Sequence, residues 1–138
     1  MAIEITPQIE DRLAREQVIW LTTTKADGTP LPNPVWFFWD GKQFLIFTEL
    51  GSVKMRNMAR NPSVALNLNT DFDGDDVAIF QAVAEVNGTP LTDSERNAYL
   101  SKYEEGIKSI GLTPEILMGA YRLVRVTPVK FRTVAAVG

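Results

Sequence analysis

The sequence contains neither cysteine nor histidine among its 138 residues. Their absence excludes disulfides, thiol nucleophiles, serine–histidine relays, and zinc or iron sites built on thiolate or imidazole ligands, so we expect no metal site. A chain without cysteine also fits the reducing cytoplasm. Any catalytic or binding role must therefore be sought among the other side chains.

Excess positive charge and long apolar runs are missing as well. The formal net charge of -3 argues against general nucleic-acid binding, which needs a basic surface. There is no basic run typical of a membrane-surface segment and no apolar run long enough to span a bilayer. The N-terminal residues 1–6 lack the basic start and apolar stretch of a signal peptide. We therefore expect a cytoplasmic protein that binds neither nucleic acid nor membrane.

The residues that are present suit one globular domain. Hydrophobic residues make up 45% of the chain and charged residues 22%, as is usual for soluble globular proteins. The length is sufficient for one domain with a real core but short for two. We expect residues 1–138 to form a single domain.

Local patterns predict a mainly β protein with a few short helices. Capping residues and apolar spacing predict helices over 7–16, 52–60, from Thr92 to a break at Gly111, and from Thr113. Alternating or β-branched segments predict strands at 18–23, 35–39, 44–48, 64–68, 77–86 and 121–126, the last extending over 129–133 past Pro128. Parallel βαβ units would need a helix after nearly every strand, so the pattern favours a small antiparallel barrel with peripheral helices.

Three prolines precede the second predicted strand. Pro30, Pro32 and Pro34 occupy alternate positions directly before Val35. Because proline lacks an N–H group, we expect no regular strand before Val35, and the segment suits an edge or bulged lead-in.

The segment from Val35 to Lys54 carries most of the functional information. Its first strand is apolar on both faces, with Trp36 and Phe38 on one face and Val35, Phe37 and Trp39 on the other. One face can pack in the barrel core, whereas the other needs a helix, a second subunit or a planar ligand. A strand buried on both sides within the protein explains the pattern equally well.

The residues that follow form a potential anion site. Ser52 begins a predicted helix, and Lys54 lies within its first turn, with Arg56 and Arg60 further along. Helix N-termini attract anions through free N–H groups and a partial positive charge. An ordinary serine cap on a solvated basic helix is the commoner alternative.

Two other groups of charged residues carry weaker functional signals. The acidic loop Asn69–Gly74 lacks the first-position Asp and twelfth-position Glu of an EF-hand, so we expect a solvated turn rather than a calcium site. Arg122 and Arg125 fall on opposite faces of the last strand. They are either surface charges, or one of them reaches an anionic ligand across a dimer interface.

The order and spacing of several motifs resemble the pyridoxamine 5'-phosphate oxidase-like superfamily, most closely its small flavin- or deazaflavin (probable coenzyme F420)-dependent branch. The similarity extends over nearly the whole chain. It is carried by Thr22-Thr23-Thr24, Asp27-Gly28, Pro30, Pro34-Val35-Trp36-Phe37, Asp40-Gly41, Phe47-Thr48, Ser52-x-Lys54, Arg56-Asn57, Asn61-Pro62-Ser63-Val64-Ala65-Leu66, Asp75-Asp76-Val77 and Arg125-Val126-Thr127-Pro128.

This resemblance implies an FMN-binding-like split β-barrel, an antiparallel barrel of Greek-key type, that forms a homodimer with two cofactor sites at its interface. The strand matching Asn33 to Phe37 would lie along the cofactor ring, largely through its main chain. The cofactor's phosphate-bearing tail would be held by Phe47, Thr48, Ser52, Val53 and Lys54, with Arg56 reinforcing the positive field.

Departures from the family pattern refine this expectation. True pyridoxamine phosphate oxidases carry an arginine and a lysine where this chain has Pro32 and Phe37, and their C-terminal histidine has no counterpart here. These differences argue against vitamin B6 oxidation. The acidic tail of F420 favours a basic open groove, which Lys54, Arg56 and Arg60 could provide.

The resemblance implies an oxidoreductase in which the cofactor carries the chemistry. We expect F420-dependent hydride transfer to an electron-poor small molecule, with an FMN-dependent oxidoreductase, a non-catalytic cofactor carrier and a purely structural barrel as alternatives. Catalytic side chains are unknown. Tyr99, Tyr103 and Tyr121 are possible proton donors, although packing roles account for them equally.

Overall fold

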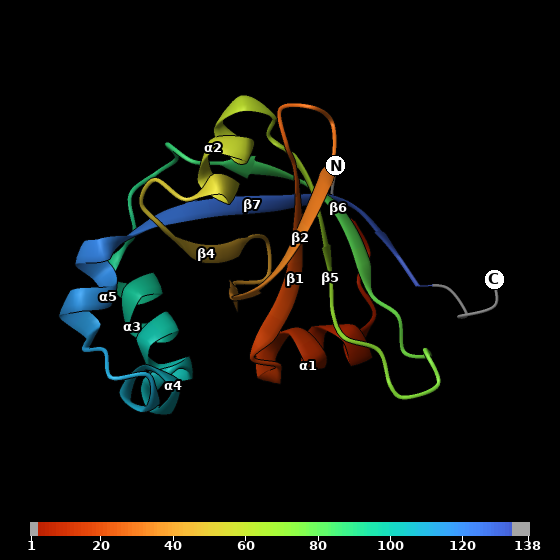
Figure 1. The fold of residues 1–138 in the computed structure, drawn as a ribbon. Helices are drawn as coiled ribbons and strands as arrows, with labels where there is room; N and C mark the ends of the chain where they lie inside the picture. Colours follow the sequence, from red (N-terminus) through yellow and green to blue (C-terminus); the bar gives the residue numbers. More distant parts are fainter. Residues whose placement is uncertain (1–2, 134–138) are drawn as a thin grey trace.

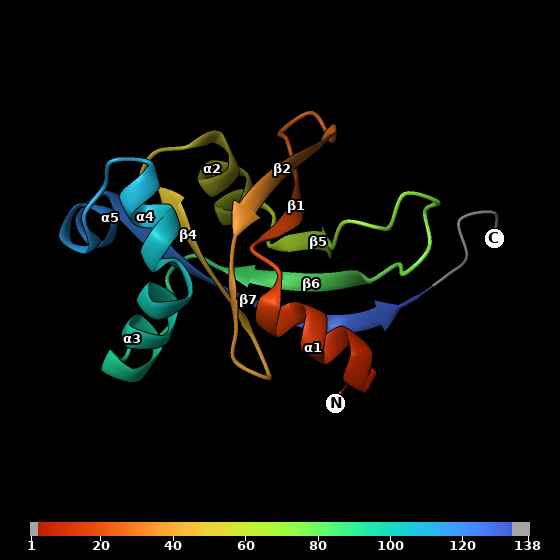
Figure 2. The ribbon, with the colours of Figure 1, turned by 90° about the horizontal axis from the view of Figure 1, so that it is seen from below.

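The computed structural model describes residues 3–133, and it forms a mainly β split barrel. Seven strands make one antiparallel sheet in the order β2-β1-β5-β6-β7-β4-β3. They are β1 (Val18–Thr24), β2 (Pro30–Trp36), β3 (Phe38–Trp39), β4 (Phe44–Glu49), β5 (Ser63–Asn67), β6 (Ile79–Glu85) and β7 (Tyr121–Arg132). The two edge strands, β2 and β3, are joined by Phe37 alone. The sheet therefore has to curl until its edges meet, as Figures 1 and 2 show.

Five helices surround the sheet: α1 (Pro7–Arg15), α2 (Val53–Arg60), α3 (Asp93–Lys102), α4 (Glu104–Ser109) and α5 (Pro114–Ala120). Four of them begin as predicted, because the side chains of Thr6, Ser52, Thr92 and Thr113 each accept a hydrogen bond from the amide three residues later. Helices α3 to α5 gather at one end of the sheet, and α1 and α2 lie apart from them (Figure 1). Within residues 3–133, no helix has both the length and the apolar character needed to cross a membrane.

The prediction of no regular strand before Val35 is wrong, because β2 begins at Pro30 and pairs with β1 over its whole length. The expected position at a sheet edge is confirmed. The prolines lie opposite Thr24, Thr22 and Trp20. β2 is an edge strand, and alternate residues direct their N–H groups to the same side. Three prolines spaced by two therefore remove donors from one side only, and pairing continues on the other.

The second predicted strand is divided. Pairing stops at Phe37, so β2 ends at Trp36 and the short β3 pairs with β4 instead of β1. Conversely, β7 runs without interruption through Pro128. A register shift where Pro128 lies opposite Ala82 accommodates the proline.

The aromatic strand separates two hydrophobic clusters, as its alternation predicts. The barrel core contains Val35, Phe37 and Trp39. The opposite face bears Trp36 and Phe38, which pack against a helical cluster from α3, α4 and α5. The buried members of this helical cluster are Tyr99, Tyr103, Ile107 and Leu117. Helices of the chain itself thus cover much of the second apolar face.

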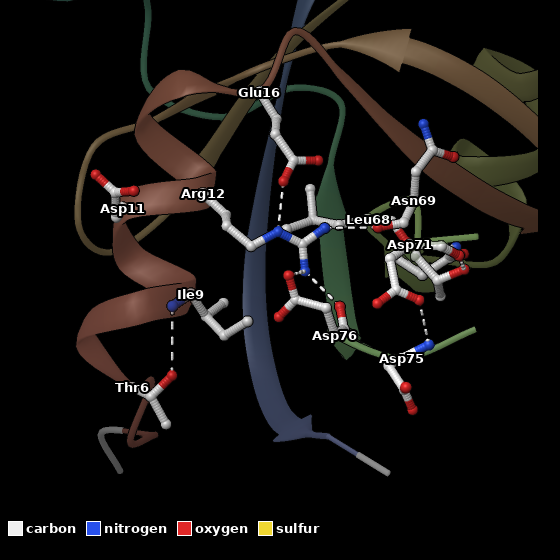
Figure 3. Close-up of polar contacts among 12 residues, drawn as sticks. Thr6, Ile9, Asp11, Arg12, Glu16, Leu68, Asn69, Asp71, Asp75 and Asp76 are labelled. Carbon is white, nitrogen blue, oxygen red and sulfur yellow. Dashed lines mark hydrogen bonds and ion pairs between the residues drawn. The ribbon is translucent and has the colours of Figure 1, made fainter. Parts of the chain in front are cut away.

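The acidic loop lies at the end of the sheet opposite α3 to α5 (Figure 2). A buried arginine holds this loop in place. The guanidinium of Arg12 donates to the carbonyls of Asn69 and Asp76 and pairs with Glu16 (Figure 3). Within the loop, the Asp71 carboxylate accepts the amides of two later residues. These bonds give the predicted turn a defined conformation.

Candidate functional site

A pocket of about 270 Å³ lies between the barrel and the helical cluster. Its barrel side includes five residues that the sequence assigns to a cofactor site: Pro34, Val35, Trp36, Phe47 and Lys54. Its remaining walls are Glu49, Tyr99, Ile110, Leu112, Leu117 and Tyr121. The pocket therefore brings together the end of β2, the end of β4 and the start of α2.

A larger cavity of about 700 Å³ lies elsewhere, lined by Met55 and Ala59 of α2, by the 86–91 loop and by β7. None of the eleven predicted cofactor residues lines it. The larger cavity therefore lacks the residues predicted to bind a cofactor. The smaller pocket is the candidate site because five of those residues line it.

Aromatic rings form the apolar wall of the site. The Trp36 indole stacks on Tyr103, with ring centroids 4.6 Å apart and planes inclined by 9°. Phe47 meets Tyr99 edge to face at a centroid distance of 4.6 Å. The side chain of Val35 packs in the barrel core, so we infer that this residue borders the pocket through its main chain. Such a wall suits a flat apolar ligand.

The start of α2 reaches the pocket through Lys54, whereas Ser52 and Val53 are not part of its lining. The Ser52 hydroxyl accepts the Met55 amide at 3.2 Å, which makes it a helix cap. Within residues 3–133, the amides of Val53 and Lys54 have no acceptor, and the first turn has no acidic residue. Lys54 is half-buried and borders the pocket. Free amides and an ammonium group together favour an anion, although Glu49, which also lines the pocket, opposes it.

Other predicted site residues lie outside the pocket. The Phe37 side chain is fully buried in the barrel core. Thr48 is also fully buried, and its hydroxyl is the single buried side-chain polar atom within residues 3–133 without a hydrogen-bond partner. The Asn33 amide donates to the carbonyl of Pro32, and Arg56 donates to the carbonyl of Gly51. Val53 is exposed at the first position of α2.

The buried tyrosines are poor proton donors. Tyr99 and Tyr103 are each 1% exposed, and burial raises the pKa of both phenols well above their usual range. A phenol with a raised pKa releases its proton less readily at neutral pH. Tyr121, by contrast, is half-buried and borders the pocket.

The two arginines of β7 have different roles. Arg125 is 6% exposed, so the expectation of a surface charge is wrong for this residue. Its guanidinium binds both oxygens of Glu95 at 2.8 Å and the carbonyls of Thr89 and Pro90. Arg125 thus joins α3 to the barrel. Arg122 is exposed and forms no ion pair within residues 3–133.

The apolar residues on the helical wall of the pocket were not among the site residues predicted from sequence. Ile110, Leu112 and Leu117 lie near the break between two predicted helices, where the apolar pattern indicates packing but not the packing partner. The spacing of Tyr99 and Tyr103 is the one signal that predicts a common aromatic helix face.

Comparison with solved structures reveals the same fold in proteins of diverse description. An F420 reductase has 25% identity and a TM-score of 0.72, with 93% of this chain and 98% of that chain covered. A FAD-binding protein from Mesorhizobium loti has 15% identity and a TM-score of 0.70, with 90% and 87% covered. The heme-storage protein HutZ from Vibrio cholerae has 18% identity and a TM-score of 0.67, with 94% of each chain covered.

No curated protein matches this chain significantly. The profile of the pyridoxamine 5'-phosphate oxidase family, however, matches residues 5–135, nearly the whole sequence. This match agrees with the motifs in the sequence and with the curled antiparallel sheet. The chain therefore belongs to the pyridoxamine 5'-phosphate oxidase family.

Proposed function

We propose that this protein is an oxidoreductase that binds the deazaflavin F420 at a homodimer interface and transfers hydride to an electron-poor small molecule. The observation that carries the proposal is the pocket itself. It combines the end of an edge strand and an aromatic wall with Lys54 at the start of α2. A ligand made of a planar ring and a phosphate-bearing tail needs an apolar wall and a positive group close enough for one molecule to contact both.

The described residues fit such a cofactor. The two free amides at the start of α2 and the Lys54 ammonium suit a phosphate group. Trp36 and Phe47 offer apolar surface to a planar ring. The pocket of about 270 Å³ lies just below the range usual for small-molecule sites, about 300–1,000 Å³. A second subunit placed over the open side would enlarge and close it.

The residues of this chain would bind and orient rather than react. Lys54 would neutralise the tail, and Trp36 with Phe47 would exclude water from one side of the ring. When bound in its reduced form, the deazaflavin would supply hydride to an acceptor such as an enone, imine or quinone. The low acidity of Tyr99 and Tyr103 argues against either of them as the proton donor. Solvent or the less buried Tyr121 would supply the proton, and main-chain amides would stabilise negative charge on the ring.

Two alternatives have specific support. FMN shares the planar ring and phosphate that the pocket suits, so an FMN-dependent oxidoreductase is the second candidate. A cofactor carrier without catalytic activity is the third. Among the described residues, the pocket lining contains no serine or threonine and a single carboxylate, Glu49, and the heme-storage neighbour is a storage protein with the same fold.

Titration followed by fluorescence separates these candidates. We expect F420 to bind more tightly than FMN, and turnover of an enone panel with reduced F420 to distinguish a reductase from a carrier. Binding of neither cofactor would refute the proposal. Sedimentation equilibrium at the same concentrations tests the homodimer. If the protein is a monomer under the conditions in which it binds F420, the proposed site at a dimer interface is refuted.

Lys54→Ala tests the anion site. Loss of an ammonium that contacts a phosphate should weaken F420 binding roughly tenfold, the cost of one charge-assisted contact. Lys42→Ala is the matched control, because Lys42 is exposed in the β3–β4 turn and lies outside the pocket. Equal affinities of the two variants would contradict the role of Lys54.

A further inference from the structure

The Trp36 side chain is held on two sides by the helical cluster. One face of its indole stacks almost parallel on Tyr103, at 4.6 Å between centroids. The far edge of the benzene ring faces Gly106 of α4, where an added Cβ would lie 3.2 Å from both Cζ2 and Cη2. The part of Trp36 that borders the pocket is therefore the part that these two residues leave uncovered.

Tyr103 is itself fixed by hydrogen bonds. Its hydroxyl accepts the Phe37 amide at 2.8 Å and lies within hydrogen-bond distance of two carbonyls, that of Gln17 at 2.6 Å and that of Phe37 at 2.8 Å. The ammonium of Lys102 donates to the same Phe37 carbonyl at 2.8 Å. Two neighbouring side chains of the helical cluster thus hold the main chain just where β2 ends, one residue after Trp36.

Gly106 has a steric role at this point. Its φ angle is not positive, so its backbone does not require glycine. Glycine in a helix costs about 1 kcal/mol relative to alanine. The close approach of the Trp36 ring gives a reason for its presence, because a methyl group at 3.2 Å is too tight unless the indole gives way by a few tenths of an ångström.

We propose that Tyr103 and Gly106 are positioning residues that hold the Trp36 indole as a fixed stacking wall for the planar ring of the bound ligand. The inference rests on the proposed function for its ligand, and it adds the residues that determine where the ring lies. A wall fixed in advance reduces the ordering cost of binding. The ligand class is a planar heteroaromatic ring with an anionic tail.

Gly106→Ala and Gly119→Ala form a matched pair of variants. Both glycines lie in helices and gain helix propensity from alanine, but an added Cβ at Gly119 meets nothing within 4 Å. With FMN and F420 as probes, we expect Gly106→Ala to weaken binding roughly two- to tenfold, the range for one aromatic contact. Gly119→Ala should bind as the wild type does. Equal affinities of the two variants would overturn the proposal.

Tryptophan emission provides a readout that needs no ligand. The emission of Trp36 is obtained by subtracting, for each protein, the emission spectrum of the same protein that also carries Trp36→Phe. We expect Gly106→Ala and Tyr103→Leu to shift this emission and increase its quenching by acrylamide, and Tyr103→Phe, which keeps the stacked ring, to change it less. An unchanged Trp36 signal in Gly106→Ala would refute the positioning role.

These readouts separate the two claims. If the wild type binds neither FMN nor F420 while the Trp36 emission responds as expected, the proposed function fails, and the positioning of the Trp36 indole by Tyr103 and Gly106 stands. If the wild type binds a cofactor and Gly106→Ala neither weakens binding nor shifts the emission, the cofactor site stands and the positioning role is refuted.

Discussion

The barrel core and the helical cluster pack against opposite faces of the aromatic segment 35–39, which joins β2 to β3. The two clusters differ in chemistry. The barrel core is almost entirely aliphatic or phenylalanine, and Phe44 at its centre is fully buried among Phe37, Trp39 and Phe80. The helical cluster uses tyrosine and tryptophan. Polar bonds attach it to the barrel, through Tyr103 and Lys102 at one point and Glu95 at another.

The difference shows how one segment, residues 35–39, can contribute both to a stable core and to the wall of a pocket. An apolar core is stabilised by burial and packing that have little directional preference. Hydrogen bonds and stacked rings impose definite directions, and the pocket opens beside the cluster that contains them. We therefore expect changes in the core to alter stability most, and changes in the helical cluster to alter the pocket at smaller cost.

The largest effect is expected for Phe44→Ala in the barrel core. Loss of a fully buried phenylalanine should reduce the free energy of unfolding by about 3–5 kcal/mol, measured by urea denaturation. Phe72→Ala is the control, because Phe72 is fully exposed in the acidic loop, and it should change the value by less than about 0.5 kcal/mol. A loss below about 1 kcal/mol in Phe44→Ala would show that the core is not the main source of stability.

A smaller effect is expected where Glu95 joins the helical cluster to the barrel. The hydrogen bonds from Arg125 lower the pKa of Glu95 from 4.5 to about 2. A carboxyl with a lowered pKa in the folded state stabilises the fold fully above about pH 4.5, and this contribution is lost as the pH falls toward 2. Glu95→Gln should therefore be less stable than the wild type at pH 7 by about 1.5–3 kcal/mol, and the difference should shrink on acidification.

Glu104→Gln is the control for this experiment. Glu104 is exposed and pairs with Lys108 at 3.7 Å on the helix surface, where such pairs contribute about 0–1 kcal/mol. Urea unfolding at a series of pH values measures both variants. A constant difference between Glu95→Gln and the wild type from pH 7 to 2 would contradict the assigned role of the ion pair.

The smallest effect is expected for Lys102. Burial over the Phe37 ring lowers the pKa of its ammonium group to about 8, against a usual 10.5. The unfolded chain then binds this proton more tightly, so stability should rise as the pH increases from about 8 to 10.5. Thermal unfolding should show this rise in the wild type and in Lys108→Ala, whose ammonium is exposed. If Lys102→Met shows the same rise in stability with pH, the rise does not come from the Lys102 ammonium group and the prediction is contradicted.

Much of the fold could be predicted from local sequence. The caps at Thr6, Ser52 and Thr92 were correctly placed because they depend on residues only three positions apart. The two faces of the aromatic strand followed from alternation. The proline segment was mispredicted because proline disfavours strands in general, whereas an edge strand leaves one side free of pairing.

Part of the candidate pocket follows from residues that are close in sequence, but its helical wall does not. Five residues predicted to bind the cofactor, Pro34, Val35, Trp36, Phe47 and Lys54, line one pocket, and their role in binding stays a prediction. At the break between β2 and β3, the Phe37 amide donates to the hydroxyl of Tyr103, a residue 66 positions later. Arg125 illustrates the same limit, because its partner Glu95 is 30 residues away.

The sequence by itself determined the class of fold, the helix starts, the two-sided strand and the family, because these follow from short-range patterns and from motif order. The tertiary structure decided which face of Trp36 is covered, which arginine is buried and which of the predicted residues share a pocket. Those outcomes depend on how distant segments pack. The physical reason is that a side chain's burial and hydrogen-bond partners are set by its neighbours in space, and local propensity does not specify them.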